Sequence, residues 1–343
     1  LFRSGARSVG LLKRTLKKAL YSSMSNELVL GAARKKMLRG KVIVLMYHEL
    51  AEDNDAIEAW TIIRRQDFVR QMEYLKANFE VVSIDEALRA KESVGRQKPL
   101  AVVTFDDGYA GNRRILLPIM KSMGLPVAIF VSTGAVISRE LYWYDRIITA
   151  AQSDRESRLD LNQMGLGFYR LNRTQGSANW AETQRLLADL KELQPLERET
   201  VVAEILEMLK DNAGASRYAI GHLTQEEIKE MSESPLVTFG AHSHCHGMLP
   251  QLTPAGVTES VMKSKRLLEK WTGKEIKYFA YPSGAYDKKV INALKDGGFE
   301  CSFTTKSKPW DSEHLLEIPR IGVGRYDSFD HFKIRASNAL ARF

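Results

Sequence analysis

Unbroken apolar runs alternate with amphipathic stretches along most of this 343-residue chain. The runs at 42–46, 102–105 and 126–131 are typical of strands buried on both faces of a parallel sheet. Between them, apolar positions recur at helical spacing, as in 67–78 and 115–123. This alternation of buried strands and amphipathic helices predicts an α/β domain built from βα units.

Local patterns give the predicted helices their starting points and divide the chain. Ser83 with Glu86, and Thr224 with Glu227, have the spacing of capping boxes that begin helices. Between the two, from about 138, helical patterns replace the alternation. The chain is therefore predicted to have four parts: a basic N-terminal segment 1–40, a first barrel part 41–137, a helical insertion 138–235, and a second barrel part with a C-terminal tail 236–343. Further strands are expected at 236–239, 276–281, 300–304 and 318–323.

The bulk composition is that of an ordinary globular protein, with 44% hydrophobic and 27% charged residues. No apolar run reaches the 18 residues expected of a membrane-spanning helix. The two cysteines, Cys245 and Cys301, form no recognisable framework and do not indicate a compartment. Ten Lys or Arg residues against one acid give residues 1–40 a charge of +9, so the remaining chain carries −1 of the total of +8. This near-neutral remainder gives no reason to expect nucleic-acid binding.

The basic segment itself contains a predicted amphipathic helix at 9–21. Leu12, Leu16 and Leu20 lie on one of its faces and lysines and arginines on the others. Because cations interrupt the apolar stretch, it does not have the form of a secretory signal. We expect peripheral contact with an anionic membrane, and hence a cytoplasmic enzyme at the inner membrane face. A helix packed on its own domain, or a frayed tail, is the alternative, and the initial Leu leaves a removed segment open.

Two adjacent carboxylates, Asp106 and Asp107, end the central apolar strand. Neighbouring side chains on a continuing strand point to opposite faces, so both can reach one cavity only if the chain turns. Gly108 permits such a turn because it adopts positive φ without a steric penalty. A simple Asp-Gly turn with an aspartate helix cap is the alternative reading of this stretch.

Three histidines follow the strand predicted at 236–239. If the intervening residues wind as one helical turn, His242 and His246 face the same point, and His244 points away. Two imidazoles and one carboxylate suit a zinc-like ion and leave a coordination position open for water, which is typical of catalytic rather than structural sites.

Three motifs occur in a telling order: T-F-D-D-G at 104–108, H-S-x-x-H at 242–246 and Y-P-x-G at 281–284. Together they resemble the polysaccharide deacetylases of carbohydrate esterase family 4, the NodB-homology type. The resemblance covers roughly residues 41–135 and 236–325. It omits the basic N-terminus and most of the insertion.

This resemblance implies a distorted (β/α) barrel of about seven strands, a divalent metal with zinc as the favoured ion, and hydrolysis of N-acetyl groups from hexosamines in a glycan. By position, Asp107, His242 and His246 match the metal ligands and Asp106 matches the catalytic base. The backbone N–H of Ser283 would stabilise the oxyanion, at a position where the family usually has tyrosine.

Two residues of the family pattern are not at their usual places. The arginine that braces the catalytic aspartate falls on Ala280; Arg320 is a candidate substitute, with a surface or structural arginine as the alternative. No L-x-H motif supplies the acid that protonates the leaving amine. We expect His48 to do so rather than His314, because it follows a predicted strand. The Tyr47-His48 pair also resembles the exopolysaccharide-associated branch.

The sequence therefore predicts a metal-dependent hydrolase that removes N-acetyl groups from a polysaccharide or lipid-linked glycan. A catalytically weakened member that binds glycan or acts as a scaffold is the alternative. A third reading, with Ser283 as nucleophile, lacks the G-x-S-x-G elbow. The aromatic run Tyr142, Trp143 and Tyr144 either stacks on a sugar face or packs at the boundary of the insertion.

Overall fold

The computed structural model describes residues 21, 24–55, 57–90, 97–152, 156–171, 177–209 and 220–339. The amphipathic helix predicted at 9–21 lies outside this part of the chain except for Tyr21. Within the described residues, no helix combines the length and the hydropathy needed to cross a bilayer.

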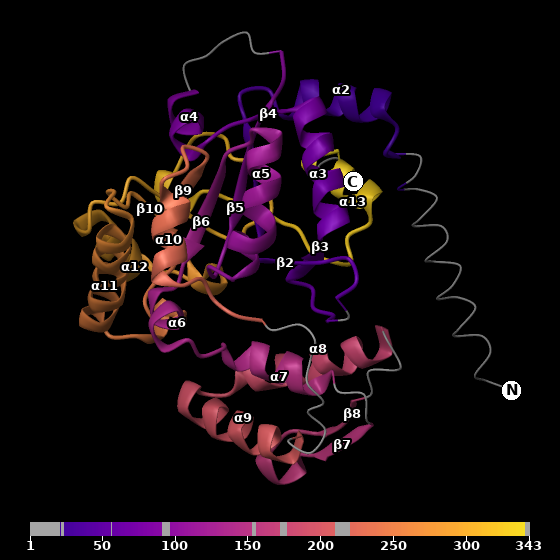
Figure 1. Cartoon of the computed structure of the whole chain (residues 1–343), viewed down its shortest axis with the longest axis vertical. Coiled ribbons are helices and arrows are strands. Elements are labelled where there is room, and N and C mark those ends of the chain that lie inside the picture. Colours follow the sequence, from indigo (N-terminus) through magenta and orange to yellow (C-terminus); the bar gives the residue numbers. More distant parts are fainter. Residues whose placement is uncertain are drawn as a thin grey trace, which may run out of the picture.

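A curled parallel sheet forms the centre of the fold (Figure 1). Its strands follow the order β11-β10-β9-β6-β5-β1-β12, and β4 also pairs with β5. Their bounds are β1 Val42–Tyr47, β4 Glu80–Val81, β5 Leu100–Phe105, β6 Val127–Val131, β9 Val237–Ala241, β10 Tyr278–Ala280, β11 Cys301–Phe303 and β12 Ile321–Gly322. The predicted α/β architecture is confirmed.

The sheet closes on itself near its last strand. The N–H of Ile318 donates to the carbonyl of Ser302 at 2.9 Å, and the N–H of Thr304 donates to the carbonyl of Ile318 at 2.8 Å. Three residues further on, Ile321 pairs with Leu45 of β1. Because one short stretch pairs with both edges of the sheet, the strands enclose a barrel. This agrees with the predicted distorted (β/α) barrel of about seven strands.

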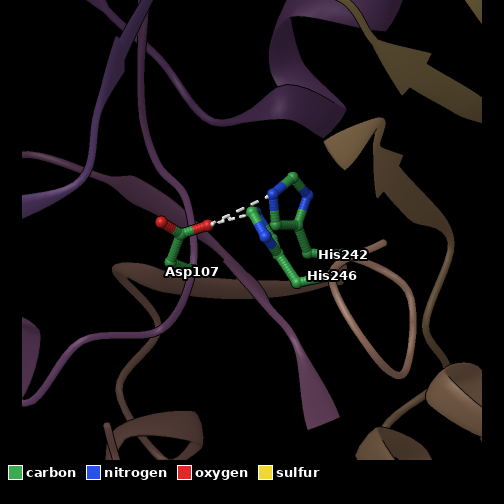
Figure 2. A group of neighbouring side chains, drawn as sticks. All are labelled: Asp107, His242 and His246. Carbon is green, nitrogen blue, oxygen red and sulfur yellow. Dashed lines mark ion pairs between the residues drawn. The ribbon is translucent and has the colours of Figure 1, made fainter. Parts of the chain in front are cut away.

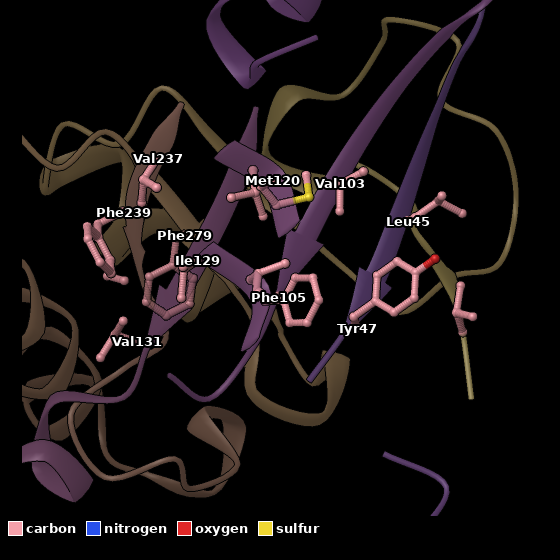
Figure 3. Packing of buried hydrophobic residues seen from close by; sticks show 14 of the residues in the cluster. Leu45, Tyr47, Val103, Phe105, Met120, Ile129, Val131, Val237, Phe239 and Phe279 are labelled. Atoms are coloured by element: carbon pink, nitrogen blue, oxygen red, sulfur yellow. The ribbon is translucent and has the colours of Figure 1, made fainter. Parts of the chain in front are cut away.

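Alternating side chains on these strands fill two separate cores. Leu45, Tyr47, Val103 and Phe105 face the surrounding helices (Figure 3), while a second cluster that includes Val102 lies on the other face of the sheet. All six residues of β5 are buried. Burial on both faces explains why these strands are continuous apolar runs instead of alternating sequences.

The helices around the barrel begin largely where the sequence predicts. Both capping boxes form, at the starts of α4 and α10. The barrel helices are α3 Arg65–Asn78, α4 Ile84–Arg89, α5 Leu117–Met123, α6 Thr133–Ser138, α10 Gln225–Ser232, α11 Pro254–Thr272, α12 Lys288–Asp296 and α13 Phe329–Ala336. A π-helical turn, η2 Asn112–Leu116, precedes α5, and the short parallel strands β2 Glu49–Ala51 and β3 Ile62–Arg64 pair beside the barrel.

The insertion forms a body of its own beside the barrel (Figure 1). It contains helices α7 Trp143–Ala151, α8 Ser177–Glu192 and α9 Pro195–Leu209 around a shared apolar cluster. The prediction of a helical insertion is incomplete, because β7 Ser157–Asp160 and β8 Phe168–Leu171 also pair there as an antiparallel hairpin. These strands have only four residues each, too few for their alternation to stand out in the sequence.

Helix α2, Glu27–Met37, packs on the barrel through Leu30 and Arg34, both of which are buried. The guanidinium of Arg34 donates to Tyr74 at 2.6 Å, to Asn78 at 2.7 Å and to Ser337 at 3.2 Å. One of the ten cations of the basic segment is therefore used inside the fold. Six of the other nine precede this helix in the sequence and lie outside the described residues.

Candidate metal centre

The turn after β5 places two carboxylates at the same end of the barrel. Side chains along a strand alternate between its two faces, so Asp106 is expected on the same face as Val102 and Thr104. The backbone then changes, because Asp107 has φ 73° and Gly108 has φ 71°. The turn predicted at Gly108 is present, and Asp107 shares its left-handed conformation. Positive φ is uncommon for a residue with a Cβ and costs about 1–3 kcal/mol where it occurs. The backbone is therefore held in a rare conformation at the residue where the second carboxylate is needed.

His242 and His246 converge through an irregular loop, and the predicted helical turn between them is wrong. The N–H of His242 donates to the carbonyl of Val131 at 3.0 Å, which anchors the loop to β6. Ser243 and His246 both have positive φ, 63° and 53°. The hydroxyl of Ser243 accepts a hydrogen bond from the N–H of His246 at 3.1 Å. Two left-handed residues thus bring the imidazoles together without a helix.

Asp107, His242 and His246 form a compact cluster (Figure 2). Oδ1 of Asp107 lies 3.0 Å from Nε2 of His246 and 3.3 Å from Nε2 of His242. One candidate ligand atom from each residue lies within 4.8 Å of the other two. His244 is not part of this group, since its Nδ1 lies 2.9 Å from the hydroxyl of Thr133.

These residues fit a divalent metal ion in three respects. Oδ1 of Asp107 is buried and has no hydrogen-bond partner within the described residues. Nδ1 of His242 lies 2.7 Å from the carbonyl of Ala280, so it carries the proton and leaves Nε2 with a lone pair toward the cluster. Burial raises the pKa of Asp107, but the electrostatic influence of His246 and His242 outweighs it and holds the pKa well below its ordinary value. An ionised carboxylate and two imidazoles are typical zinc ligands.

Asp106 is held by Arg320 through two hydrogen bonds of 2.7 Å each, one to each carboxylate oxygen. The arginine is fully buried, and it also donates to the carbonyl of Thr304 at 3.0 Å and to the hydroxyl of Thr104 at 3.2 Å. Burial raises the pKa of Asp106, but the charge of Arg320 lowers it by more than burial raises it. The pKa therefore lies below its ordinary value. Arg320 therefore braces Asp106, as the first of the two predicted alternatives had it, and is not a surface arginine.

His48 directly follows β1, as predicted, and its Nδ1 is buried without a hydrogen-bond partner among the described residues. Its ring lies edge-on to Trp60, with 5.3 Å between the centroids. Burial lowers the pKa of His48, although the charges of Asp107 and Asp106 oppose this. The alternative, His314, has a side chain that is 79% exposed and lies beside Glu313.

Ser283 lies in a 3-10 turn, Pro282–Gly284, immediately beyond β10. It is exposed and has φ 55°. Its side chain makes no hydrogen bond to a histidine in the part of the chain described, so nothing there would activate it as a nucleophile. Its predicted role as a backbone donor to an oxyanion remains a prediction.

Aromatic residues from the insertion lie against the cluster, a contact that sequence reasoning missed. The hydroxyl of Tyr144 donates to Oδ2 of Asp107 at 3.3 Å, and the ring of Tyr142 lies 4.5 Å from that of His246. His222, also missed, is buried and stacks on Tyr109 at 5.3 Å. The only signal available in the sequence was the position of Tyr142 and Tyr144 at the start of the insertion.

A curled (β/α) barrel with an Asp-His-His cluster and an arginine-braced aspartate defines a protein with a candidate divalent-metal centre. The sequence model of the family described as Polysaccharide deacetylase matches residues 192–302. This stretch contains the motifs at 242–246 and 281–284, so this part of the chain is similar to that family.

Individual relatives are distant. YxkH of Bacillus subtilis (strain 168), whose assignment as a polysaccharide deacetylase is itself provisional, is 19% identical over 268 residues, which are 78% of this chain and 65% of that protein. The chain thus spans about two thirds of its relative's length. The deacetylase PplD of Streptococcus pyogenes, in complex with acetate, superposes with a TM-score of 0.55 at 19% identity, covering 85% of this chain and 96% of that one. IcaB from Ammonifex degensii superposes with a TM-score of 0.55 at 19% identity, covering 87% of this chain and 97% of that one. At this identity the structural likeness supports the fold.

Proposed function

We propose that this protein is a metal-dependent hydrolase that removes N-acetyl groups from hexosamine residues of a polysaccharide or lipid-linked glycan. The observation that carries the proposal is the adjacency of the Asp107, His242 and His246 cluster to Asp106, which Arg320 keeps ionised. The similarity of residues 192–302 to the polysaccharide deacetylase family supports an acetylated glycan as substrate.

Asp107, His242 and His246 would hold the ion, and zinc is the favoured one for this ligand set. When bound, such an ion supplies Lewis acidity and a water whose pKa is lowered to about 7. The protein's own residues move the protons. The carboxylate of Asp106 takes a proton from the water as that water's oxygen forms a bond to the amide carbonyl carbon. The backbone N–H of Ser283 donates to the developing oxyanion.

Breakage of the C–N bond then releases an amine, which must gain a proton. His48 is proposed to supply it, because it is the histidine at the end of β1, where Asp106 and Asp107 influence its pKa. Since burial lowers the pKa of His48, its resting imidazole is neutral. It must therefore take up a proton after the substrate has bound, and this proton balances the one that Asp106 takes from the water and later releases to solvent. Acetate and a free hexosamine amine are the products of the balanced reaction.

The branch and location of the enzyme follow from weaker observations. The Tyr47-His48 pair supports an exopolysaccharide-associated role. The basic segment supports peripheral contact with an anionic membrane at its cytoplasmic face, near lipid-linked glycans, and the near-neutral remainder of the chain favours no nucleic-acid partner.

The test is release of acetate from a panel of N-acetylated oligosaccharides, with and without a chelator, together with metal content. Two variants separate the proposed roles. Asp106→Asn keeps its metal and loses turnover, whereas His246→Ala loses both. Loss of metal from Asp106→Asn, or full metal and rate in His246→Ala, would contradict these assignments. Turnover that is unaffected by thorough metal removal would contradict the proposal as a whole.

The alternative of a weakened glycan-binding or scaffold member was based on the absence of the usual motif-three arginine. Since Arg320 makes two hydrogen bonds to Asp106, that observation no longer favours it. A wild-type protein that binds metal and glycan but releases no acetate would restore this alternative.

A further inference from the structure

The two oxygens of Asp107 have different partners. Oδ1 faces the imidazoles of His242 and His246, whereas Oδ2 accepts a hydrogen bond from the hydroxyl of Tyr144 at 3.3 Å. Tyr144 belongs to α7, the first helix of the insertion, and therefore lies outside the barrel that supplies the cluster. A part of the chain without a proposed role thus reaches the candidate metal centre.

Tyr144 is held in place by contacts that tie α7 to the turn carrying Asp107. Tyr109, two residues after Asp107, donates from its hydroxyl to Asp145 at 2.8 Å, and both residues are buried. Tyr142 stacks on Tyr144 with 5.2 Å between the ring centroids. The start of α7 is therefore bound to the turn through hydrogen bonds on both sides of Gly108.

The other end of the insertion contacts the same turn. The N–H of Ala110 donates to the carbonyl of Gly221 at 2.7 Å, and the N–H of Leu223 donates to the carbonyl of Gly108 at 2.9 Å. His222, between these two bonds, stacks on Tyr109. Both ends of the insertion thus contact the few residues that carry the proposed ligand.

We propose that Tyr144 is a positioning residue for Asp107 and that the insertion, through it, completes the metal centre. The inference rests on the proposed metal site, but not on the identity of the glycan. A carboxylate that can rotate offers either oxygen, or both, to an ion. A donor on Oδ2 fixes its rotation and leaves Oδ1 for the ion, as is typical of residues that orient metal ligands.

Tyr142 provides a matched control on the same helix. Its ring lies nearer to that of His246 than the ring of Tyr144 does, at 4.5 Å against 6.0 Å between centroids. Its hydroxyl, however, makes no hydrogen bond to Asp107 in the part of the chain described. Tyr→Phe at either position keeps the aromatic ring and removes one hydroxyl, so the pair isolates the hydrogen bond from the packing.

The experiment measures Zn²⁺ affinity of the full chain by competition with a chromogenic chelator. Tyr144→Phe is expected to bind about 10- to 100-fold more weakly than wild type, the range found for residues that orient metal ligands. Tyr142→Phe is expected to bind as wild type does. Thermal unfolding of the metal-free proteins is the second readout, with equal Tm expected for all three. Added Zn²⁺ should then raise the Tm of Tyr144→Phe less than that of the others.

Two results would overturn the inference. Wild-type affinity in Tyr144→Phe would mean that the hydroxyl does not orient Asp107. An equal loss in both variants would mean that the aromatic cover acts only through packing. If the wild-type protein itself binds no Zn²⁺, the metal site fails together with this inference, whereas either of the first two results leaves the site intact.

Discussion

Replacing Arg320 with Met should lower the free energy of unfolding of the barrel more than the loss of a surface ion pair does. The side chain has no exposed area and makes two hydrogen bonds of 2.7 Å to Asp106, which is 3% exposed. Methionine has a similar volume but leaves the carboxylate buried without a partner. Breaking a buried pair in this way costs about 3–5 kcal/mol. The matched control is Arg113→Met, which breaks an exposed contact of 3.0 Å to Glu230 and should cost about 0–1 kcal/mol.

Urea unfolding of the metal-free proteins provides the measurement. Because Arg320 lowers the pKa of Asp106, its stabilisation is present above the unfolded-state pKa of about 4 and is lost as the pH falls through the lower folded-state value. The difference between wild type and Arg320→Met should therefore be full at pH 7 and shrink under strongly acidic conditions. Adding Asp106→Asn to Arg320→Met should recover part of the loss. Equal losses in Arg320→Met and Arg113→Met would refute the reasoning.

Three further predictions concern other parts of the chain. His48→Ala should lower kcat about 10²- to 10⁴-fold and His314→Ala should not; equal rates for His48→Ala and wild type across pH 6 to 9 would exclude His48 as the acid. Burial lowers the pKa of His222 to about 4, so on acidification the unfolded chain binds a proton at this residue before the folded chain does. The free energy of unfolding should therefore fall by about 1.4 kcal/mol for each unit that the pH drops from 6.5 to 4. His222→Phe should remove that part of the slope in urea unfolding, and an unchanged slope would contradict the assignment. Deleting residues 1–20 should abolish salt-sensitive co-sedimentation with anionic vesicles and spare hydrolysis of a soluble substrate. Vesicle binding that persists after the deletion would mean that another part of the chain makes the membrane contact.

The deletion ends at residue 20 because α2 packs on the barrel. Removing residues 1–40, the whole segment treated as separate in the sequence, would also delete Leu30 and Arg34, which are buried against the fold. Loss of vesicle binding in that longer variant would not distinguish a missing membrane contact from a damaged barrel.

Features encoded within a few neighbouring residues were predictable from the sequence. The strands buried on both faces, the two capping boxes and the turn at Gly108 all follow from short-range patterns with a direct physical cause. The residues that come together as Asp107, His242 and His246 were also identifiable, because each lies just beyond a strand of one parallel sheet.

Features that depend on distant pairs were not predictable. Arg320 and Asp106 are 214 positions apart, and no local pattern distinguishes a buried partner from a surface arginine. The same holds for Tyr144 and Asp107, where an aromatic run at a boundary is equally typical of packing. The loop between His242 and His246 was predicted as helical because the i, i+4 spacing suits a helix, whereas two residues with positive φ achieve the same convergence.

The stretch that closes the sheet also carries Arg320. Ile318 pairs with β11, Ile321 pairs with β1, and Arg320 lies between them. During synthesis this stretch leaves the ribosome after every residue of the candidate metal centre has already been made. A chain that lacks this stretch would still contain the three proposed metal ligands but not the arginine that pairs with Asp106 and favours its ionised form. The competence of the proposed base is therefore tied to completion of the fold, and a chain truncated before residue 318 should retain the metal ligands and lack a working base.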